Sequence, residues 1–450
     1  MSGGVVWTTG PAEAAAALVA TAPAARGGTR WTLIGDVAVL WGAEAPPAAA
    51  ELARWAGVEA RPATVGGLAL VTQVGAAFQQ EYPDVEVLVD RGRHLVVDAS
   101  LVPPEPAEHV DWKVEPLPAD TAVVTRHPPV PGRAEPEIGA VVDSLSPSSY
   151  EQDVTHLASL ATRHSLSAGF KDAAAYCVGR LEAAGYTVTR ESVSVGGGTS
   201  ENLVADRRGA GAERRRVLVT AHLDSVNTAG GPAAAAPGAD DNASGAAGAM
   251  TLSRALAEHA FEADTRVILF GGEEQGLHGS RQHVAALPAD ERSRIAGVVN
   301  LDMVGRRNGP VAGVLLEGAP VSSWLVDRLA AAAAAWTGLT VETSLAPFAS
   351  DHVPFIDAGV PAVLTIEGND RANTDVHTAR DTLATLDHGL ALEILRMDVA
   401  VLAELLGLVR GGAAAAVPRP AGPVVSRAPG SVDVFALGPG RSAVHGTVEG

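Results

Sequence analysis

Cysteine is nearly missing from this sequence of 450 residues, which contains Cys177 alone. An intrachain disulfide is therefore excluded, and so is a zinc site made of four cysteines or of two cysteines and two histidines. Any metal ion must be held mainly by His, Asp and Glu. Cys177 lies in the apolar-periodic stretch Ala173–Val178, which predicts the buried face of a helix rather than a catalytic thiol.

Positive charge and long apolar runs are also scarce. The sequence has 33 basic and 52 acidic residues, and only two of the basic residues are lysines. This balance argues against a nucleic-acid partner, because contacts to phosphate need clustered Lys and Arg. No stretch reaches the roughly 18 apolar residues that a membrane span needs. The N-terminus lacks a basic segment of the kind that opens a signal peptide, so the sequence leaves the compartment open between cytoplasm and export.

Composition divides the chain into four parts. Residues 1–100 predict a small N-terminal α/β or α+β domain, with helices over 12–22 and 49–56 and hairpins over 31–41 and 85–99. Its role stays open between a pro-region, an inhibitor of the site and a protein-binding module. Residues 101–140 are rich in proline and predict an extended linker. Residues 411–450 form a Gly/Ala/Pro-rich tail that predicts loose packing.

Residues 141–410 alternate apolar strand-like runs with long helical runs. This alternation predicts an α/β fold with a mostly parallel central sheet and helices on both faces. The predicted strands cover residues 187–193, 202–205, 217–221, 266–270, 297–301, 311–316 and 361–366. The predicted helices cover residues 150–163, 171–184, 244–259, 280–286, 321–335 and 389–406.

Acidic and histidine residues follow three of these strands directly. His222 and Asp224 come after the strand at 217–221, Glu273 and Glu274 after the next strand, and Asp302 after the strand at 297–301. Ligands of open α/β sheets bind at the carboxyl ends of the strands. Several carboxylates there cost desolvation energy unless a cation pairs with them. The pattern therefore indicates a metal site.

Two polar loops extend this set. Residues 238–245 carry Asp241 and lead into a helix, and residues 373–378 carry His377 after the last strand. Together with His222, Glu274 and Asp302 they give two imidazoles and three carboxylates. If one carboxylate bridges two ions, each ion has three protein ligands and one open position for water, which a catalytic zinc site requires.

Five blocks carry a family resemblance. They are Ala221–Ser225, Gly238–Gly245, Gly272–Ser280, Asn300–Met303 and His377–Thr382. In this order they resemble the di-zinc exopeptidase family of aminopeptidases and glutamate carboxypeptidases. The resemblance covers roughly residues 145–410, excludes the first hundred residues, and implies two Zn²⁺ ions per chain.

The resemblance also implies a role for each residue. Asp241 would bridge both ions, His222 and Asp302 would complete one site, and Glu274 and His377 would complete the other. Catalytic roles would fall to Glu273 as general base and to Asp224 as the carboxylate that orients His222. The family pattern further implies a cis peptide between Asp241 and Asn242.

The implied activity is hydrolysis of a peptide bond by a metal-dependent exopeptidase. An aminopeptidase that removes N-terminal residues is favoured, with a metal-bridging water and Glu273 as the base. A carboxypeptidase or dipeptidase of the same fold, a single-zinc glutaminyl-cyclase-like acyltransferase and a catalytically inactive binding protein are the alternatives. Val376 departs from the family pattern, because some members carry a tyrosine before the last histidine ligand. The expected partner is a peptide substrate, and the oligomeric state is left open.

Overall fold

The structure is a computed structural model. It describes residues 3–9, 29–35, 37–42, 59–65, 67–102, 111–119, 121–127, 134–212, 215–409, 424–428, 431–437 and 443–448. The helices expected over 12–22 and 49–56 lie outside these residues. The chain divides into two compact units, Met1–Leu408 and Val409–Gly450. No helix within the described ranges is both long and apolar enough to cross a membrane.

The centre of the first unit is a run of four parallel strands in one large mixed sheet. In spatial order they are β13 (Asp264–Phe270), β12 (Arg216–His222), β14 (Ile295–Leu301) and β17 (Ala362–Glu367). Antiparallel pairing joins β11 (Gly198–Arg207) and then β10 (Thr187–Val195) to one side, and β15 (Gly313–Glu317) to the other, where β16 (Thr340–Ser344) follows in parallel. The α/β class is confirmed, although the parallel pairing is limited to part of the sheet.

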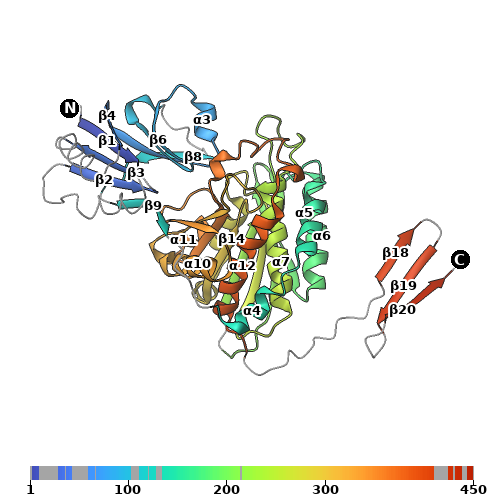
Figure 1. Cartoon of the computed structure of the whole chain (residues 1–450). Helices are drawn as coiled ribbons and strands as arrows, with labels where there is room; N and C mark the ends of the chain where they lie inside the picture. The colour runs from blue at the N-terminus through green and yellow to red at the C-terminus, as the bar shows by residue number, and fades with distance from the viewer. Residues whose placement is uncertain are drawn as a thin grey trace. The chain divides into compact units, whose positions relative to one another are not determined.

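Helices cover both faces of these strands (Figure 1). One face carries α4 (Pro136–Val142), α5 (Pro147–Ala158), α6 (Ala168–Ala183), α7 (Gly245–Ala257), α10 (Ser323–Trp336) and α12 (His388–Leu406). The other face carries α8 (His278–Ala286) and α11 (His352–Asp357), and the short α9 (Ala289–Ser293) precedes β14. All six predicted helices of this region are confirmed, with ends shifted by a few residues.

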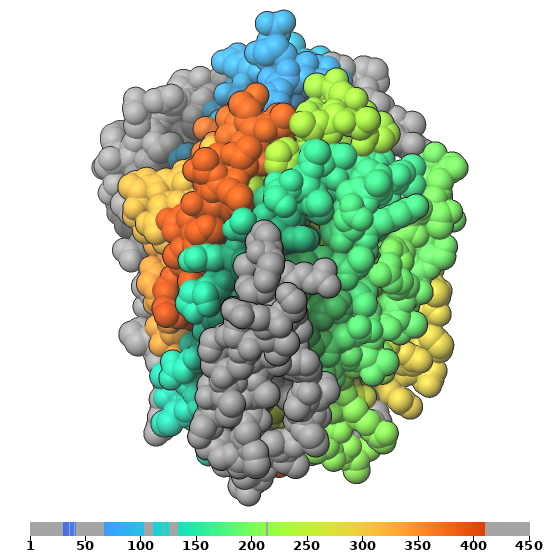
Figure 2. Space-filling view, turned by 90° about the vertical axis from the view of Figure 1, so that its right-hand side faces the viewer, coloured from blue at the N-terminus to red at the C-terminus, as the bar shows by residue number. Residues whose placement is uncertain are grey.

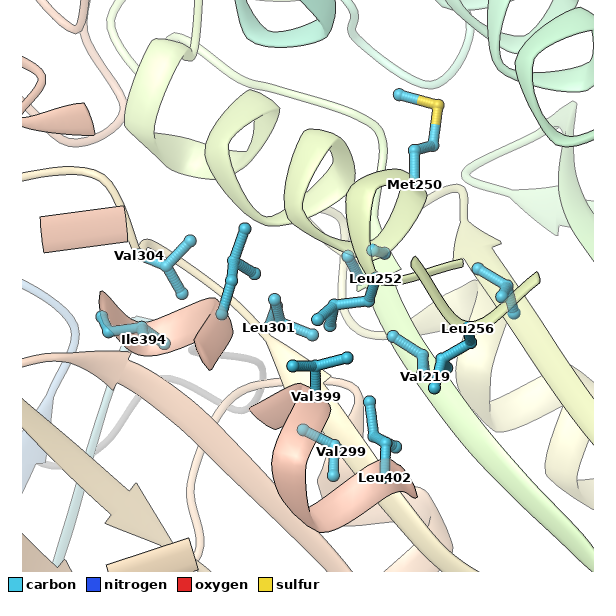
Figure 3. Close-up of a cluster of buried hydrophobic side chains, with 14 of the residues drawn as sticks. Val219, Met250, Leu252, Leu256, Val299, Leu301, Val304, Ile394, Val399 and Leu402 are labelled. Carbon is cyan, nitrogen blue, oxygen red and sulfur yellow. The ribbon is translucent and has the colours of Figure 1, made fainter. Parts of the chain in front are cut away.

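The core explains why the strands are apolar at nearly every position. Val217 and Val219 of β12 point to the α7 and α12 side, whereas Leu218 between them points to the α8 and α11 side. Figure 3 shows Val219 and Leu301 among side chains of α7, such as Leu252 and Leu256, and of α12, such as Val399 and Leu402. Gly248 lets α7 approach closely, because a Cβ there would lie 2.9 Å from Leu301 Cδ2. The central strand ends are therefore held rigidly.

The large sheet continues into the N-terminal part of the chain. Strand β9 (Thr121–His127) pairs with β16, and beyond it follow β2 (Thr29–Ile34), β3 (Val37–Gly42), β1 (Gly3–Thr9) and β4 (Glu59–Val65). A separate four-stranded sheet holds β6 (Val87–Arg91), β7 (His94–Asp98), β5 (Leu68–Gln73) and β8 (Trp112–Pro116), with α3 (Ala77–Glu81) beside it. We call these last four strands, α3 and the described residues that connect them the N-terminal lobe. The two predicted hairpins, β2–β3 and β6–β7, are confirmed.

Three segments differ from the expectations. The Pro-rich stretch 101–140 contains β8 and β9, and in β8 the buried Trp112 is the apolar anchor while prolines stand at and beyond the strand end. The tail contains β18 (Val424–Ala428), β19 (Ser431–Leu437) and β20 (Ala443–Val448), which form an antiparallel sheet of their own. Strand β16 was not predicted, because it is short and four of its five residues are polar.

Candidate metal centre

Three parallel strands bring the predicted acidic and histidine residues to one edge of the sheet. His222 is the last residue of β12, Asp302 directly follows β14, and Glu273 and Glu274 follow β13 after two glycines. The strand order β13-β12-β14 makes these ends neighbours. This is the carboxyl edge at which α/β sheets bind ligands.

Asp241 reaches the same place from the turn that precedes α7. The peptide bond between Asp241 and Asn242 is cis, as the resemblance implies. Gly238 opens the turn at φ +51°, and a Cβ there would lie 2.2 Å from the Asp241 carbonyl oxygen, so the turn needs glycine. The Asp381 carboxylate accepts hydrogen bonds from the backbone N–H groups of Asp240 and Asp241, both at 2.9 Å. The turn is therefore held in place by Asp381, a residue far along the chain.

The Asp241 carboxylate lies between the two histidines. Its Oδ1 is 3.2 Å from His222 Nε2, and its Oδ2 is 3.1 Å from His377 Nε2. His222 Nε2 also lies 3.3 Å from Asp302 Oδ1, and His377 Nε2 lies 2.9 Å from Glu274 Oε2. The structure thus brings together all five residues predicted as metal ligands, in two groups that share Asp241.

Burial and mutual charge shift the pKa values of these groups strongly. Burial raises the pKa of Glu274 to about 7, although His377 beside it acts in the opposite direction. Burial also raises the pKa of Glu273 well above its usual range, against a lowering effect of His222. Burial would lower the pKa of His377, but Glu274 and Asp241 raise it well above its ordinary value. The ionised forms of these buried carboxyl groups therefore need positive charge nearby, and a divalent cation would supply it.

The donor atoms fit a zinc ion. Ligand atoms of His222, Asp241 and Glu274 lie within 4.8 Å of one another, as do those of His222, Glu273 and Asp302. Glu274 Oε1 is buried and has no hydrogen-bond partner among the described residues, so this oxygen is available to a cation. Imidazole nitrogens and carboxylate oxygens without cysteine are a donor set that catalytic zinc sites use.

Asp224 contacts both His222 and the Glu273–Glu274 pair. Its backbone carbonyl lies 3.2 Å from His222 Nδ1, while its carboxylate Oδ1 is 3.7 Å from that nitrogen. The same carboxylate accepts hydrogen bonds from the backbone N–H groups of Glu273, at 3.3 Å, and Glu274, at 3.2 Å. Asp224 therefore positions the loop after β13 as well as the histidine.

Sequence reasoning missed residues that hold the ligands in place. Ser350 donates a hydrogen bond of 2.6 Å to Asp302 Oδ2, and Asn300 donates to the Ser350 hydroxyl at 2.9 Å. The fully buried Arg163 donates to the carbonyl oxygens of Leu223 and Gly238, both at 2.9 Å, and so ties the end of β12 to the Asp241 turn. Ser350 stands in a segment that matches the family pattern, whereas no local signal marks Arg163.

A pocket of about 270 Å³ opens over these residues. Glu273 and the five predicted ligands line it, together with residues of the N-terminal lobe, and Asp224 lies behind it. The lining is charged at the predicted site residues and at Arg93, Asp111, Lys113 and Arg281, and it is apolar at residues that include Met303, Leu364 and Ile366. The pocket can therefore hold a polar group against the carboxylates and an apolar group beside them.

A comparison with protein-family models identifies the region that carries this site. Residues 202–402 match the model described as Peptidase family M28. This match covers less than half of the chain, and we call the matched stretch, residues 202–402, the M28 region. The M28 region includes all seven predicted site residues, and it excludes the N-terminal lobe and residues 409–450.

Relatives with curated names agree with this assignment. The chain is 33% identical over 213 residues to "Leupeptin-inactivating enzyme 1" of Streptomyces exfoliatus, covering 46% of this chain and 45% of that protein. It is 31% identical over 192 residues to "Aminopeptidase YwaD" of Bacillus subtilis (strain 168), covering 41% of this chain and 40% of that protein. The matches thus span less than half the length of these two relatives.

Solved structures show the same fold. The Legionella pneumophila LapA aminopeptidase aligns with 76% of this chain and 98% of its own at a TM-score of 0.53 and 18% identity. An aminopeptidase from Aneurinibacillus sp. strain AM-1 aligns with 60% of this chain and 97% of its own at a TM-score of 0.52 and 16% identity. These similarities place the large mixed sheet and its helices in a known aminopeptidase fold.

The position of Arg163 leads to a stability prediction. The variant Arg163→Met keeps most of the side-chain stem but leaves buried carbonyl groups without donors, so we expect a loss of about 3–5 kcal/mol in the free energy of unfolding. Denaturation in urea, followed by circular dichroism, measures this loss. The matched control Arg328→Met removes an exposed cation whose side chain is 52% accessible, and it should change stability by less than about 0.5 kcal/mol. A loss below about 1 kcal/mol for Arg163→Met would contradict the structural role.

Proposed function

We propose that the M28 region is an exopeptidase that binds two zinc ions and acts as an aminopeptidase. The observation that carries this proposal is the Asp241 carboxylate, whose two oxygens face the Nε2 atoms of two different histidines at 3.2 and 3.1 Å. Asp302 adds a carboxylate on the His222 side, and Glu274 adds one on the His377 side. The name of the Bacillus subtilis relative, Aminopeptidase YwaD, supports the same activity.

In this proposal His222, Asp241 and Asp302 hold one ion, and Asp241, Glu274 and His377 hold the other. Bound zinc supplies a water of lowered pKa and polarises the scissile carbonyl. Asp224 keeps the His222 ring in place through its carbonyl oxygen, 3.2 Å from Nδ1, which favours coordination through Nε2. Ser350 holds the Asp302 carboxylate by a 2.6 Å hydrogen bond to the oxygen that does not face His222.

Glu273 is the proposed general base. It lines the pocket, and its backbone is fixed to Asp224 next to that of Glu274, so the two adjacent side chains leave the chain in different directions. Near dications its carboxylate is ionised, in spite of the burial that raises its pKa. It can therefore accept a proton from water and deliver it to the leaving amine.

The pocket supports action at a chain end. Its volume of about 270 Å³ lies just below the range of roughly 300–1,000 Å³ that is typical of sites for drug-sized ligands. A long peptide could place only a terminal part inside it. The complete set of ligands also argues against an inactive binding protein, and the second histidine and glutamate argue against a site for one ion only.

Substrate panels test the direction of attack. We expect the zinc-loaded chain to release amines from aminoacyl-anilides and from peptides with a free N-terminus, because the site accepts a chain end. The same peptides with a blocked N-terminus should be cut at least tenfold more slowly, as measured by chromatography of the products. Preferential cleavage of peptides with a blocked N-terminus would indicate a carboxypeptidase, and release of a cyclised N-terminal glutamine would indicate the acyltransferase alternative.

The variant Glu273→Gln tests the base. We expect kcat to fall by about 10²–10⁴-fold, because the amide cannot accept the proton, while two zinc ions remain bound. Steady-state kinetics and metal analysis of the same sample measure both effects. The control Glu151→Gln changes an exposed glutamate of α5 in the same way and should leave both unchanged. Full activity of Glu273→Gln would show that another group is the base.

A further inference from the structure

The N-terminal lobe forms part of the pocket wall although it lies outside the M28 region. Val74, Arg93, Asp111 and Lys113 of the lobe line the pocket together with the proposed zinc ligands. Val74 packs on the apolar cluster of Met303, Leu315, Leu364 and Ile366, which Val376 also joins. In Figure 2 the blue surface of the lobe adjoins an orange surface from the last part of the first unit. The lobe and the candidate metal centre therefore share one surface.

Arg93 anchors the lobe in the M28 region by buried charge. Its side chain is 3% exposed and lies 3.0 Å from Glu317 and 3.4 Å from Asp370, which are equally buried. It also donates a hydrogen bond of 2.8 Å to the Phe348 carbonyl, and the Phe348 N–H donates to Glu317 at 2.8 Å. Removing one partner of such a buried pair is costly, so the lobe is fixed relative to the pocket.

Asp111 is held in place by the small sheet of the lobe. It directly precedes β8, and its carbonyl accepts a hydrogen bond of 2.8 Å from the Val74 N–H. The next residue, Trp112, is fully buried between Phe78 and Tyr82, and its indole N–H donates to Glu81 at 2.9 Å. A side chain next to such an anchor has a defined position.

The Asp111 carboxylate lies as far from Nδ1 of the second histidine as the Asp224 carboxylate lies from Nδ1 of the first, which also has the Asp224 backbone carbonyl at 3.2 Å. Asp111 Oδ1 lies 3.7 Å from His377 Nδ1, and Asp224 Oδ1 lies 3.7 Å from His222 Nδ1. In both histidines the opposite ring nitrogen, Nε2, faces Asp241. At 3.7 Å the contact is an ion-pair distance rather than a direct hydrogen bond, so a small shift of the ring or a water molecule would complete it.

His377 needs support from its surroundings. Its backbone has a φ of +56°, a conformation that residues other than glycine seldom adopt. Its carbonyl accepts a hydrogen bond of 3.3 Å from the Thr228 N–H, and in the described part of the chain Asp111 is the carboxylate next to its Nδ1. The carboxylate next to Nδ1 of this ring therefore comes from the lobe and not from the M28 region.

We propose that Asp111 is the positioning residue of the second zinc site, and that it orients His377 through Nδ1. This inference rests on the proposed two-zinc function. It makes the lobe a structural part of the metal centre, which argues against a lobe that serves only as a removable inhibitor. Carboxylate partners of metal-bound histidines typically contribute 10–100-fold to metal affinity, which sets the expected effect.

The test compares zinc binding by the full-length wild-type chain and by Asp111→Asn. Apo-protein is titrated with zinc chloride in competition with a chromophoric chelator, and circular dichroism verifies the fold. We expect Asp111→Asn to lower the affinity for one of the two zinc ions by 10–100-fold and to leave the affinity for the other near its wild-type value. Asp111→Glu keeps the carboxylate and should recover much of the lost affinity. Asp84→Asn, which changes an exposed aspartate of the lobe, is the matched control and should bind zinc as the wild type does.

Kinetics on the same samples separate this role from contact with substrate. A positioning residue predicts a lower kcat at limiting zinc with little change in KM. Unchanged zinc affinity in Asp111→Asn would overturn the proposal, and a raised KM in that case would assign Asp111 to the substrate.

If the wild type binds one zinc ion, the two-zinc function fails. Even then, a 10–100-fold loss of affinity for that ion in Asp111→Asn would support the role of Asp111, and an unchanged affinity would overturn it.

Discussion

Buried negative charge is the constraint on which this molecule depends. Four carboxyl groups, those of Asp241, Glu273, Glu274 and Asp302, meet two imidazoles in the pocket at the carboxyl edge of the sheet, where Asp241 and Asp302 are buried. Burying carboxylates is unfavourable unless positive charge lies among them, and burial raises the pKa values of both glutamates accordingly. Divalent cations satisfy this requirement and supply the chemistry of peptide hydrolysis at the same time.

The scaffold meets this constraint with rigid elements. Parallel strands β13, β12 and β14 end side by side and hold four site residues, while Gly248 lets α7 approach these strands closely. Around the ligands, fixed contacts come from Asp224, Asp381 and Ser350. The N-terminal lobe adds Asp111 from outside the M28 region. A site of this kind requires its supporting groups as much as its ligands.

Within residues 141–410 the sequence predicted the strands apart from β16, because apolar runs bounded by polar loops have few other interpretations. It also pointed to the residues that the structure brings together at this edge, since each follows a strand or stands in a motif. The contacts of Arg163, Arg93 and Asp111 could not be predicted, because each joins segments far apart in the chain and leaves no local pattern. The stretch 101–140 was taken for a linker on its prolines, and the strands within it form only through partners from other segments.

The measurement that tests the central claim most directly is anomalous X-ray diffraction at the zinc edge from crystals of the zinc-loaded full-length chain. The account predicts two anomalous peaks that share Asp241, one also bounded by His222 and Asp302 and the other by Glu274 and His377. A single peak, or zinc bound away from Asp241, would contradict it.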